Sequence, residues 1–155
     1  MLSRTAKKAK RPQAGDSRSG DYILDGQVGF LLRLAQQRHT TIFAGLMTEG
    51  LTPTQWAALA KLNEIGPSSQ NSLGRLTAMD AATIKGVIDR LTRRGFTKTE
   101  PDPVDGRRLL VALTAKGAAV YDRVSPIASR ITKETLAPLE ARERDQLLAL
   151  LAKLT

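Results

Sequence analysis

The stretch DAATIKGVIDRLTRRG (residues 80–95), continued by FTKTEPDPVDGRRLLVALTAKG (residues 96–117), decides the fold. In its first part, apolar side chains recur at the spacing i, i+3, i+4, i+7, which predicts a helix with one buried stripe: Ile84, Val87, Ile88 and Leu91. The opposite side carries small or charged residues: Ala82, Lys85, Gly86, Asp89 and Arg93. A glycine inside a helix costs about 1 kcal/mol relative to alanine. Gly86 therefore indicates that another molecule approaches this side closely.

The second part of the stretch predicts a β-hairpin. Two β-prone runs, Phe96–Thr99 and Leu109–Leu113, flank a turn cluster made of Pro101, Asp102, Pro103, Asp105 and Gly106. Arg107 and Arg108 follow the turn directly, where no side chain needs burying. A helix that fits a DNA major groove, beside a hairpin tipped with arginines, has the geometry of a winged helix-turn-helix. We interpret the fold class as mainly α, with a β-hairpin wing.

The order of these residues resembles the MarR family of bacterial transcriptional regulators. The family's wing pattern, Asp-x-Arg followed after five residues by Leu-Thr-x-x-Gly, is matched by Asp105, Arg107, Leu113, Thr114 and Gly117. Its recognition-helix pattern is matched by Thr83, Asp89, Arg90, Leu91 and Gly95, and LTPTQW (residues 51–56) is similar to the start of its second helix. The chain departs from the pattern at Lys85 and Gly86, where the family often has Thr and Arg. The resemblance covers residues 26–155.

Further helices follow from periodicity and capping signals. A long helix is expected from Asp25 to Met47, with an apolar face of Val28, Leu31, Leu32, Ala35, His39, Ile42, Phe43 and Leu46. Thr52, Pro53 and Gln55 combine a cap, a first-turn proline and a capping-box glutamine, which predicts a second helix ending near Gly66–Pro67. Ser69 and Asp80 are expected to cap the third and fourth helices. The third, Gln70–Thr77, is predicted to pack through Leu73 and Leu76.

The C-terminal part predicts two more helices. Thr114 is expected to cap the fifth, with Pro126 kinking it or ending its regular hydrogen bonding locally. Pro138 is expected to open the sixth, whose leucines exceed what one helix on a small lobe needs to bury: Leu147, Leu148, Leu150, Leu151 and Leu154. This excess predicts a partner chain, and hence a homodimer. Residues 21–155 then form a single domain, with a dimerisation region at 25–47 and 114–155 and a DNA-binding lobe at 52–113.

Charge and composition narrow the function. The chain has a formal net charge of +9, concentrated in residues 1–20 (six Lys/Arg against one Asp) and residues 70–116 (nine Lys/Arg against five Asp/Glu). The first segment has no apolar stripe, so we expect a disordered basic tail that is either a solvated run or a source of non-specific DNA affinity. The second coincides with the predicted helix and wing, which favours nucleic acid as the partner.

Several function classes are excluded or disfavoured. The chain has no cysteine and a single histidine, which excludes disulfides, zinc fingers and Cys/His nucleophilic pairs. No glycine-rich phosphate loop is present, and Asp102 and Asp105 are better explained as turn formers than as paired acids. We therefore expect no enzyme and no cofactor. Without a signal peptide or a long apolar run, a cytoplasmic protein with no membrane partner is the expectation.

The candidate site residues form two groups. For contact with double-stranded DNA we assign residues of the third and fourth helices and the wing: Ser69, Gln70, Ala82, Thr83, Lys85, Gly86, Arg93, Arg107 and Arg108. For a small-molecule ligand we assign Arg33, His39 and Trp56. Arg33 and His39 lie six residues apart, roughly 120° around a helix axis, and could edge one pocket from two sides. The alternatives are an ion pair for Arg33, a satisfied interior histidine and a core tryptophan.

The resemblance implies how the groups work together. Family members bind effectors between the dimerisation region and the DNA-binding lobe, and RLAQQRHTTIF (residues 33–43) is similar to regulators that respond to aromatic carboxylates or their coenzyme A thioesters. The expected function is a repressor that leaves a pseudo-palindromic operator when such an effector binds, with a hydroxycinnamoyl thioester as the narrower expectation. The alternative is a winged-helix module that binds proteins, without sequence-specific DNA binding.

Overall fold

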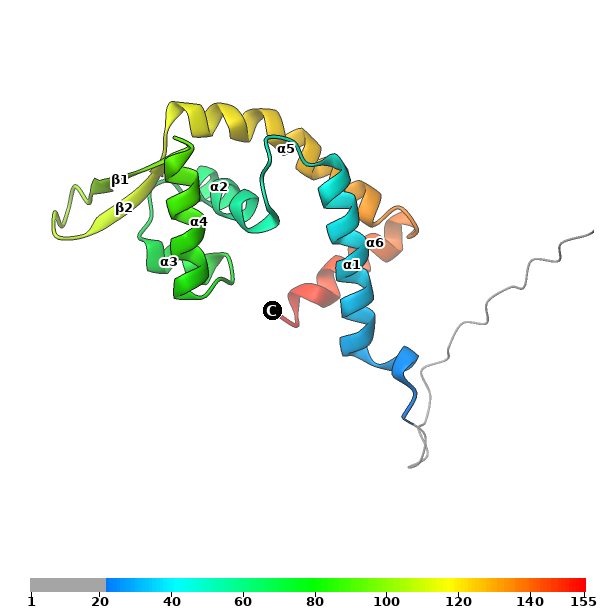
Figure 1. Ribbon diagram of the computed structural model, residues 1–155. Coiled ribbons are helices and arrows are strands. Elements are labelled where there is room, and N and C mark those ends of the chain that lie inside the picture. The colour runs from blue at the N-terminus through cyan, green and yellow to red at the C-terminus, as the bar shows by residue number, and fades with distance from the viewer. Residues whose placement is uncertain (1–21) are drawn as a thin grey trace, which may run out of the picture. The chain divides into compact units, whose positions relative to one another are not determined.

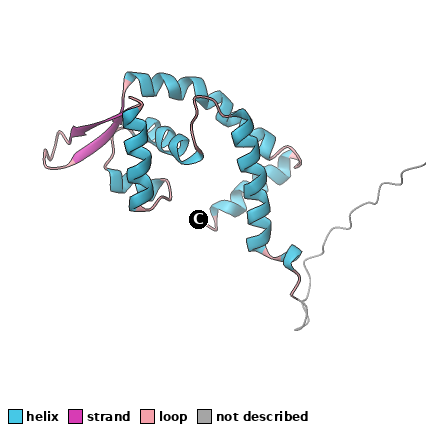
Figure 2. Cartoon of the chain, in the orientation of Figure 1, coloured by secondary structure: helices cyan, strands magenta, loops and turns pink. Residues whose placement is uncertain are grey.

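The computed structural model describes residues 22–155, so the predicted basic tail of residues 1–20 lies outside the described residues. Helices dominate the described chain, together with a two-stranded antiparallel sheet (Figure 1, Figure 2). The elements are η1 (Leu24–Gly26), α1 (Val28–Leu46), α2 (Pro53–Ile65), α3 (Gln70–Leu76), α4 (Ala81–Arg93), β1 (Thr97–Pro101), β2 (Leu109–Leu113), α5 (Ala115–Thr135) and α6 (Ala141–Ala152). The predicted fold class is confirmed. No helix among these residues is long and apolar enough to span a membrane.

The chain forms two compact units that meet within α1, between Thr40 and Thr41. The described part of the first unit holds η1 and most of α1, and none of its residues is buried. Of the apolar face predicted for this helix, only Phe43 is buried, and it belongs to the second unit. Val28 and Leu31 are exposed instead. The helix also begins later than predicted, because Gln27 takes an extended conformation and separates η1 from α1.

The hydrophobic core lies in the second unit, where α2 packs against α3, α4, α5 and β2. Figure 1 shows α4 followed by the hairpin, which leads directly into α5. The fully buried side chains come from each of these helices: Leu59, Leu62, Leu73, Ile84, Val87, Leu91, Val120, Val124 and Ile131. The whole stripe predicted for α4 is buried, so its other side faces solvent.

Capping bonds fix the starts of these helices as the sequence predicts. At α2, the Thr52 hydroxyl accepts from the Gln55 N–H at 3.3 Å, and the Gln55 side chain accepts from the Thr52 N–H at 3.1 Å. Ser69 caps α3 by accepting from the Ser72 N–H at 3.2 Å. Thr114 caps α5 in the same way through the Gly117 N–H. Each cap satisfies a backbone donor that the helix itself leaves unpaired.

The hairpin strands pair in a register running from Thr97↔Leu113 to Pro101↔Leu109. The first strand therefore extends further than the predicted Phe96–Thr99. Phe96 lies before the strand instead, with its ring in the core. An isolated bridge joins Ser68, between α2 and α3, to Val111 of β2, with two backbone hydrogen bonds of 3.0 and 2.8 Å. This bridge ties the segment just before α3 to the middle of β2.

Two further predictions about helix packing and helix ends are wrong. Leu76 is 51% exposed, although Leu73 is fully buried. The two residues are three positions apart, which turns their side chains about 60° from each other around the helix axis. The sixth helix begins at Ala141, not at Pro138, because the Glu143 side chain accepts a hydrogen bond from the Glu140 N–H at 3.0 Å and sets the first turn there. None of the residues of α6 is buried in the chain.

Candidate DNA-binding site

The exposed side of α4 is positioned by its N-terminal cap. The Asp80 carboxylate accepts a hydrogen bond from the Thr83 N–H at 2.7 Å. The Thr83 backbone bond, with that from its side chain, holds the pKa of Asp80 below its usual value. Because a lowered pKa favours the charged form when folded, the cap's contribution is present at neutral pH and is lost as the pH falls through that lowered pKa. Thr83 is thus held in the first turn, exposed, beside Ala82.

Charged residues continue this exposed side. Lys85 pairs with Asp89 one turn later, with 3.0 Å between Nζ and Oδ2, and both side chains are more than half exposed. Arg93 donates from Nε to the Asp89 carbonyl at 3.3 Å and is itself exposed. A surface ion pair of this kind contributes little stability, about 0.3–0.5 kcal/mol. Lys85 and Arg93 therefore remain available to a polyanion.

Gly86 has no packing role within the described chain. A Cβ at this position would meet only the guanidinium of Arg90, at 3.8–4.0 Å, which is the far end of a flexible side chain. The space above Gly86 is otherwise open, as expected if another molecule approaches there. Arg90 lies along this opening and is exposed, and it adds a cation that the sequence-based site did not include. In the sequence, the position of Arg90 one turn after Gly86 is the feature that could have identified it.

The wing tip is shaped by two aspartates, which confirms their role as turn formers. Asp102 Oδ1 accepts from the Val104 N–H at 2.8 Å, and Asp105 Oδ1 accepts from the Arg107 N–H at 3.2 Å. Arg107 and Arg108 are exposed beyond this turn. Arg108 also lies 3.4 Å from Asp105, but its side chain is 72% exposed, so water screens that pair strongly.

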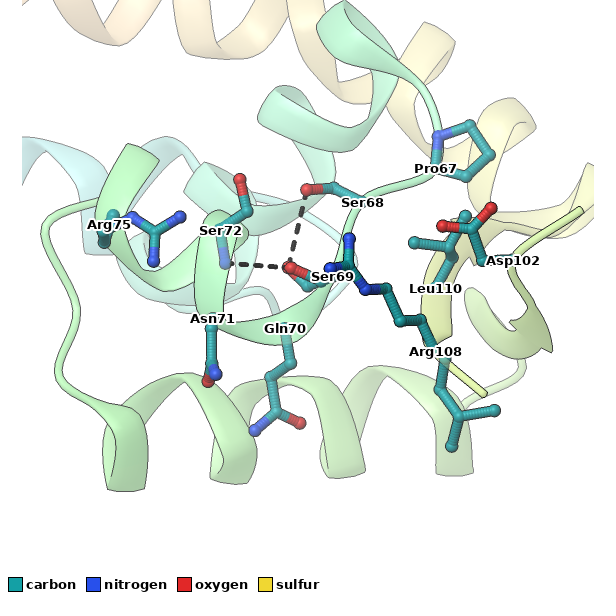
Figure 3. A pocket seen from close by; sticks show the side chains of 11 residues that line it. Pro67, Ser68, Ser69, Gln70, Asn71, Ser72, Arg75, Asp102, Arg108 and Leu110 are labelled. Atoms are coloured by element: carbon teal, nitrogen blue, oxygen red, sulfur yellow. Dashed lines mark hydrogen bonds between the residues drawn. The ribbon is translucent and has the colours of Figure 1, made fainter. Parts of the chain in front are cut away.

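A cleft of about 750 Å³ lies between the start of α3 and the part of the hairpin next to its turn. Its polar lining includes Ser69, Gln70, Asn71, Arg75, Asp102 and Arg108. Figure 3 shows Arg108 extending from the hairpin toward Ser69. The structure thus brings the predicted Ser69, Gln70 and Arg108 to one place and adds Arg75. Two guanidinium groups beside hydroxyl and amide groups provide the donors that a phosphate requires.

The predicted ligand residues are divided between the two units. Arg33 is exposed and His39 half-buried, both on the part of α1 in the first unit. Trp56 belongs to the second unit and is half-buried, with its ring stacked on that of Tyr121 from α5 at a centroid distance of 5.5 Å and an interplanar angle of 10°. Tyr121 was missed by the sequence analysis, because a contact between distant helices has no periodic signal. The joint use of Arg33, His39 and Trp56 by a ligand stays a prediction.

An exposed helix face with a basic wing defines the class of winged helix-turn-helix DNA-binding proteins, and comparison with known proteins agrees. The MarR family model matches residues 51–109, from the start of α2 to the wing. The repressor NicR of Pseudomonas putida is 40% identical over 148 residues, which are 95% of this chain and 94% of NicR. The chain belongs to the MarR family.

Two solved structures extend the likeness. A probable transcriptional regulator from Pseudomonas aeruginosa has 53% identity and a TM-score of 0.83, covering 86% of this chain and all of that one. Bordetella bronchiseptica BpsR, whose DNA binding is regulated by 6-hydroxynicotinic acid, has 39% identity and a TM-score of 0.83, covering 87% of this chain and 97% of BpsR. Members of the family are transcriptional regulators that bind operator DNA as dimers, and not enzymes. The predicted partners, duplex DNA and a second copy of the chain, follow from this membership.

Proposed function

We propose that this protein is a homodimeric repressor that leaves its operator when a small aromatic carboxylate binds. The observation that carries the proposal is the likeness over nearly the whole chain to BpsR, a protein regulated by 6-hydroxynicotinic acid. The similarity to the repressor NicR supports the same output. A free hydroxylated aromatic acid is therefore the first candidate ligand, and a hydroxycinnamoyl coenzyme A thioester is the second.

The DNA-binding part of the proposal rests on the exposed side of α4 and on the wing. Thr83 and Lys85 lie near the start of α4 and contact bases or phosphates in the major groove. Arg107 enters the adjacent minor groove, where the negative potential of a narrow groove attracts arginine. Arg108 and Arg75 hold a backbone phosphate at the cleft beside α3. The phosphate contacts position the protein, and the base contacts give the specificity.

Dimerisation is supported by apolar surface that the chain leaves uncovered. Leu148 and Leu150 of α6 are each half exposed, and Leu154, just beyond the helix, is 72% exposed. Val28 and Leu31 of α1 are similarly exposed. Burying such surface against a second copy removes it from water at about 25 cal/mol per Å². We assign residues 25–47 and 114–155 to the dimerisation region that carries this apolar surface, and residues 52–113 to the DNA-binding lobe.

The ligand part of the proposal uses the chemistry of four side chains. The Arg33 guanidinium is always charged and matches the geometry of a carboxylate. His39 can hydrogen-bond a ring hydroxyl or carbonyl, and the stacked pair of Trp56 and Tyr121 can pack against an aromatic ring. The ligand relieves repression only if it prefers the conformation that does not bind the operator, because equal affinity for both states shifts nothing.

Arg33→Ala and His39→Ala should lose ligand release while keeping operator binding. The test uses fluorescence anisotropy of a labelled operator duplex, with 6-hydroxynicotinate, benzoate-type and cinnamate-type acids and the corresponding thioesters titrated into the complex. We expect one of the free acids to release the wild-type protein. Removal of Arg33 should weaken that response by about tenfold or more, because a hydrogen bond to a charged group contributes about 1.5–3 kcal/mol.

A matched variant on the same helix provides the control. Arg38→Ala removes an exposed guanidinium from α1 outside the proposed ligand contacts and should leave the ligand response unchanged. If no acid or thioester releases the operator at millimolar concentration, the proposed ligand class is wrong. If a ligand releases the operator from Arg33→Ala and wild type alike, Arg33 has only a structural role.

A further inference from the structure

The turn that joins α1 to α2 has an unusual backbone. Glu49 and Gly50 are consecutive residues with positive φ angles, 60° and 57°. Glycine adopts this region freely, but a residue with a side chain does so uncommonly. A conformation of this kind persists only where its surroundings hold it. Two arginines bond to this turn: Arg94, directly after α4, and Arg123 of α5.

Arg94, the C-cap residue directly after α4, makes the first set of these bonds. Its guanidinium donates from Nη2 to the carbonyl of Glu49 and from Nη1 to the carbonyl of Gly50, the latter at 3.4 Å. The same group lies over the ring of buried Phe96, with Cζ 4.4 Å from the ring centroid. The guanidinium of Arg94 thus connects the end of α4 to two carbonyls of the turn and to the core.

Lys116 and Arg123 of α5 complete the cluster. Lys116 donates from Nζ to the backbone carbonyl of Arg94 at 2.9 Å, and so satisfies a carbonyl at the end of α4. Arg123 holds the side chain of Glu49, with Nη2 and Nε at 2.9 and 3.2 Å from Oε1. Of the two arginines, Arg94 is the one that directly follows α4, as its C-cap residue. Arg123 reaches the same turn from α5.

We propose that Arg94 is a positioning residue for operator recognition: it fixes the C-terminal end of α4 on the turn at Glu49 and Gly50. The N-terminal end is already fixed by the Asp80 cap, and the buried stripe sets the face that points inward. Base contacts require side chains to be held within about 0.5 Å of their working geometry. Loss of Arg94 should therefore weaken base readout more than phosphate contact. This inference rests on the proposed DNA-binding function.

Arg94→Ala should lower affinity for the operator about tenfold and leave affinity for a scrambled duplex of the same length unchanged. The operator probe is a duplex enriched from a random pool by the wild-type protein, and both affinities are measured at several salt concentrations. The slope of log K against log salt should stay at the wild-type value, because no phosphate contact is removed. Arg93→Ala, on the proposed DNA-facing side, should lower both affinities and make that slope shallower by about one unit.

Two further variants make the result decisive. Arg94→Lys keeps the charge and replaces the planar fork by one donor nitrogen, so it should recover part of the discrimination. If Arg94→Ala has a lower thermal stability than wild type, Arg94→Lys serves as the test variant in its place. Arg123→Ala removes the bonds from α5 to the Glu49 side chain. It should leave the preference for the operator over the scrambled duplex intact. Equal loss of both affinities in Arg94→Ala, with a shallower salt slope, would make Arg94 a phosphate contact and overturn the proposal. Equal loss of discrimination in Arg123→Ala would overturn it too. A wild-type protein with no preference for any duplex would instead reject the proposed function.

Discussion

Gly117→Ala should destabilise the fold by about 3 kcal/mol, the largest effect expected of an added methyl group at any glycine that the structure describes. Gly117 is buried in the first turn of α5. It packs against the backbone of Phe96, the residue directly before β1. A Cβ at this position would lie 2.0 Å from the carbonyl oxygen of Phe96 and 2.9 Å from its carbonyl carbon. That carbonyl accepts a hydrogen bond from the Thr114 N–H at 3.0 Å, so it cannot move without breaking the start of α5.

Urea denaturation of Gly117→Ala, compared with wild type, measures this loss directly. Gly106→Ala is the matched control, because a Cβ there meets nothing within 4 Å, and its stability should stay within about 0.5 kcal/mol of wild type. The comparison also gives a physical reason for the glycine in the wing pattern Leu-Thr-x-x-Gly. A loss below about 1 kcal/mol in Gly117→Ala would show that α5 can shift away from Phe96, contrary to the packing described.

Arg107→Ala should weaken operator binding by about 1–3 kcal/mol without a change in thermal stability. The side chain lies just beyond the wing turn and is exposed, so its removal leaves no cavity. Its backbone N–H still bonds to Asp105, which keeps the shape of the wing. The loss should be visible as a larger dissociation constant for the operator at near-physiological salt.

Arg130→Ala provides the control for the loss of one positive charge, since Arg130 is an exposed residue of α5 outside the proposed site. It should change operator affinity by less than about 0.5 kcal/mol at that salt concentration, where distant exposed charges are screened. Unchanged affinity in Arg107→Ala, or an equal loss in both variants, would refute the contact assigned to the wing.

Local rules explain which parts of the fold were predictable. Caps act within four residues of the chain, so Thr52 with Gln55, Asp80 and Thr114 mark the helix starts correctly. The stripe of α4 was equally clear, because the helix has a single buried side. At Pro126 the helix continues, and the Ser125 hydroxyl donates at 3.4 Å to the Asp122 carbonyl, which lacks an N–H partner from the proline.

Contacts between distant segments were not predictable. The sequence places Arg94 only at the end of a helix, and its bonds to Glu49 and Gly50 span more than forty positions. The stacking of Trp56 on Tyr121 is likewise a product of helix packing. The predicted start of a helix was wrong where a side-chain bond overrides the preference of proline for the first helical position. Pro138 was expected to open α6, but the bond between Glu140 and Glu143 starts the helix later.

Selection of bound duplexes from a random pool tests the central claim most directly. Because a twofold dimer presents two copies of α4, the wild-type protein should enrich a pseudo-palindrome with half-sites about one helical turn apart. Affinity for the enriched duplex should fall steeply as salt rises, as release of counterions demands. Enrichment of no sequence, or binding that is weak and indifferent to salt, would contradict sequence-specific DNA recognition and favour a winged helix that binds proteins.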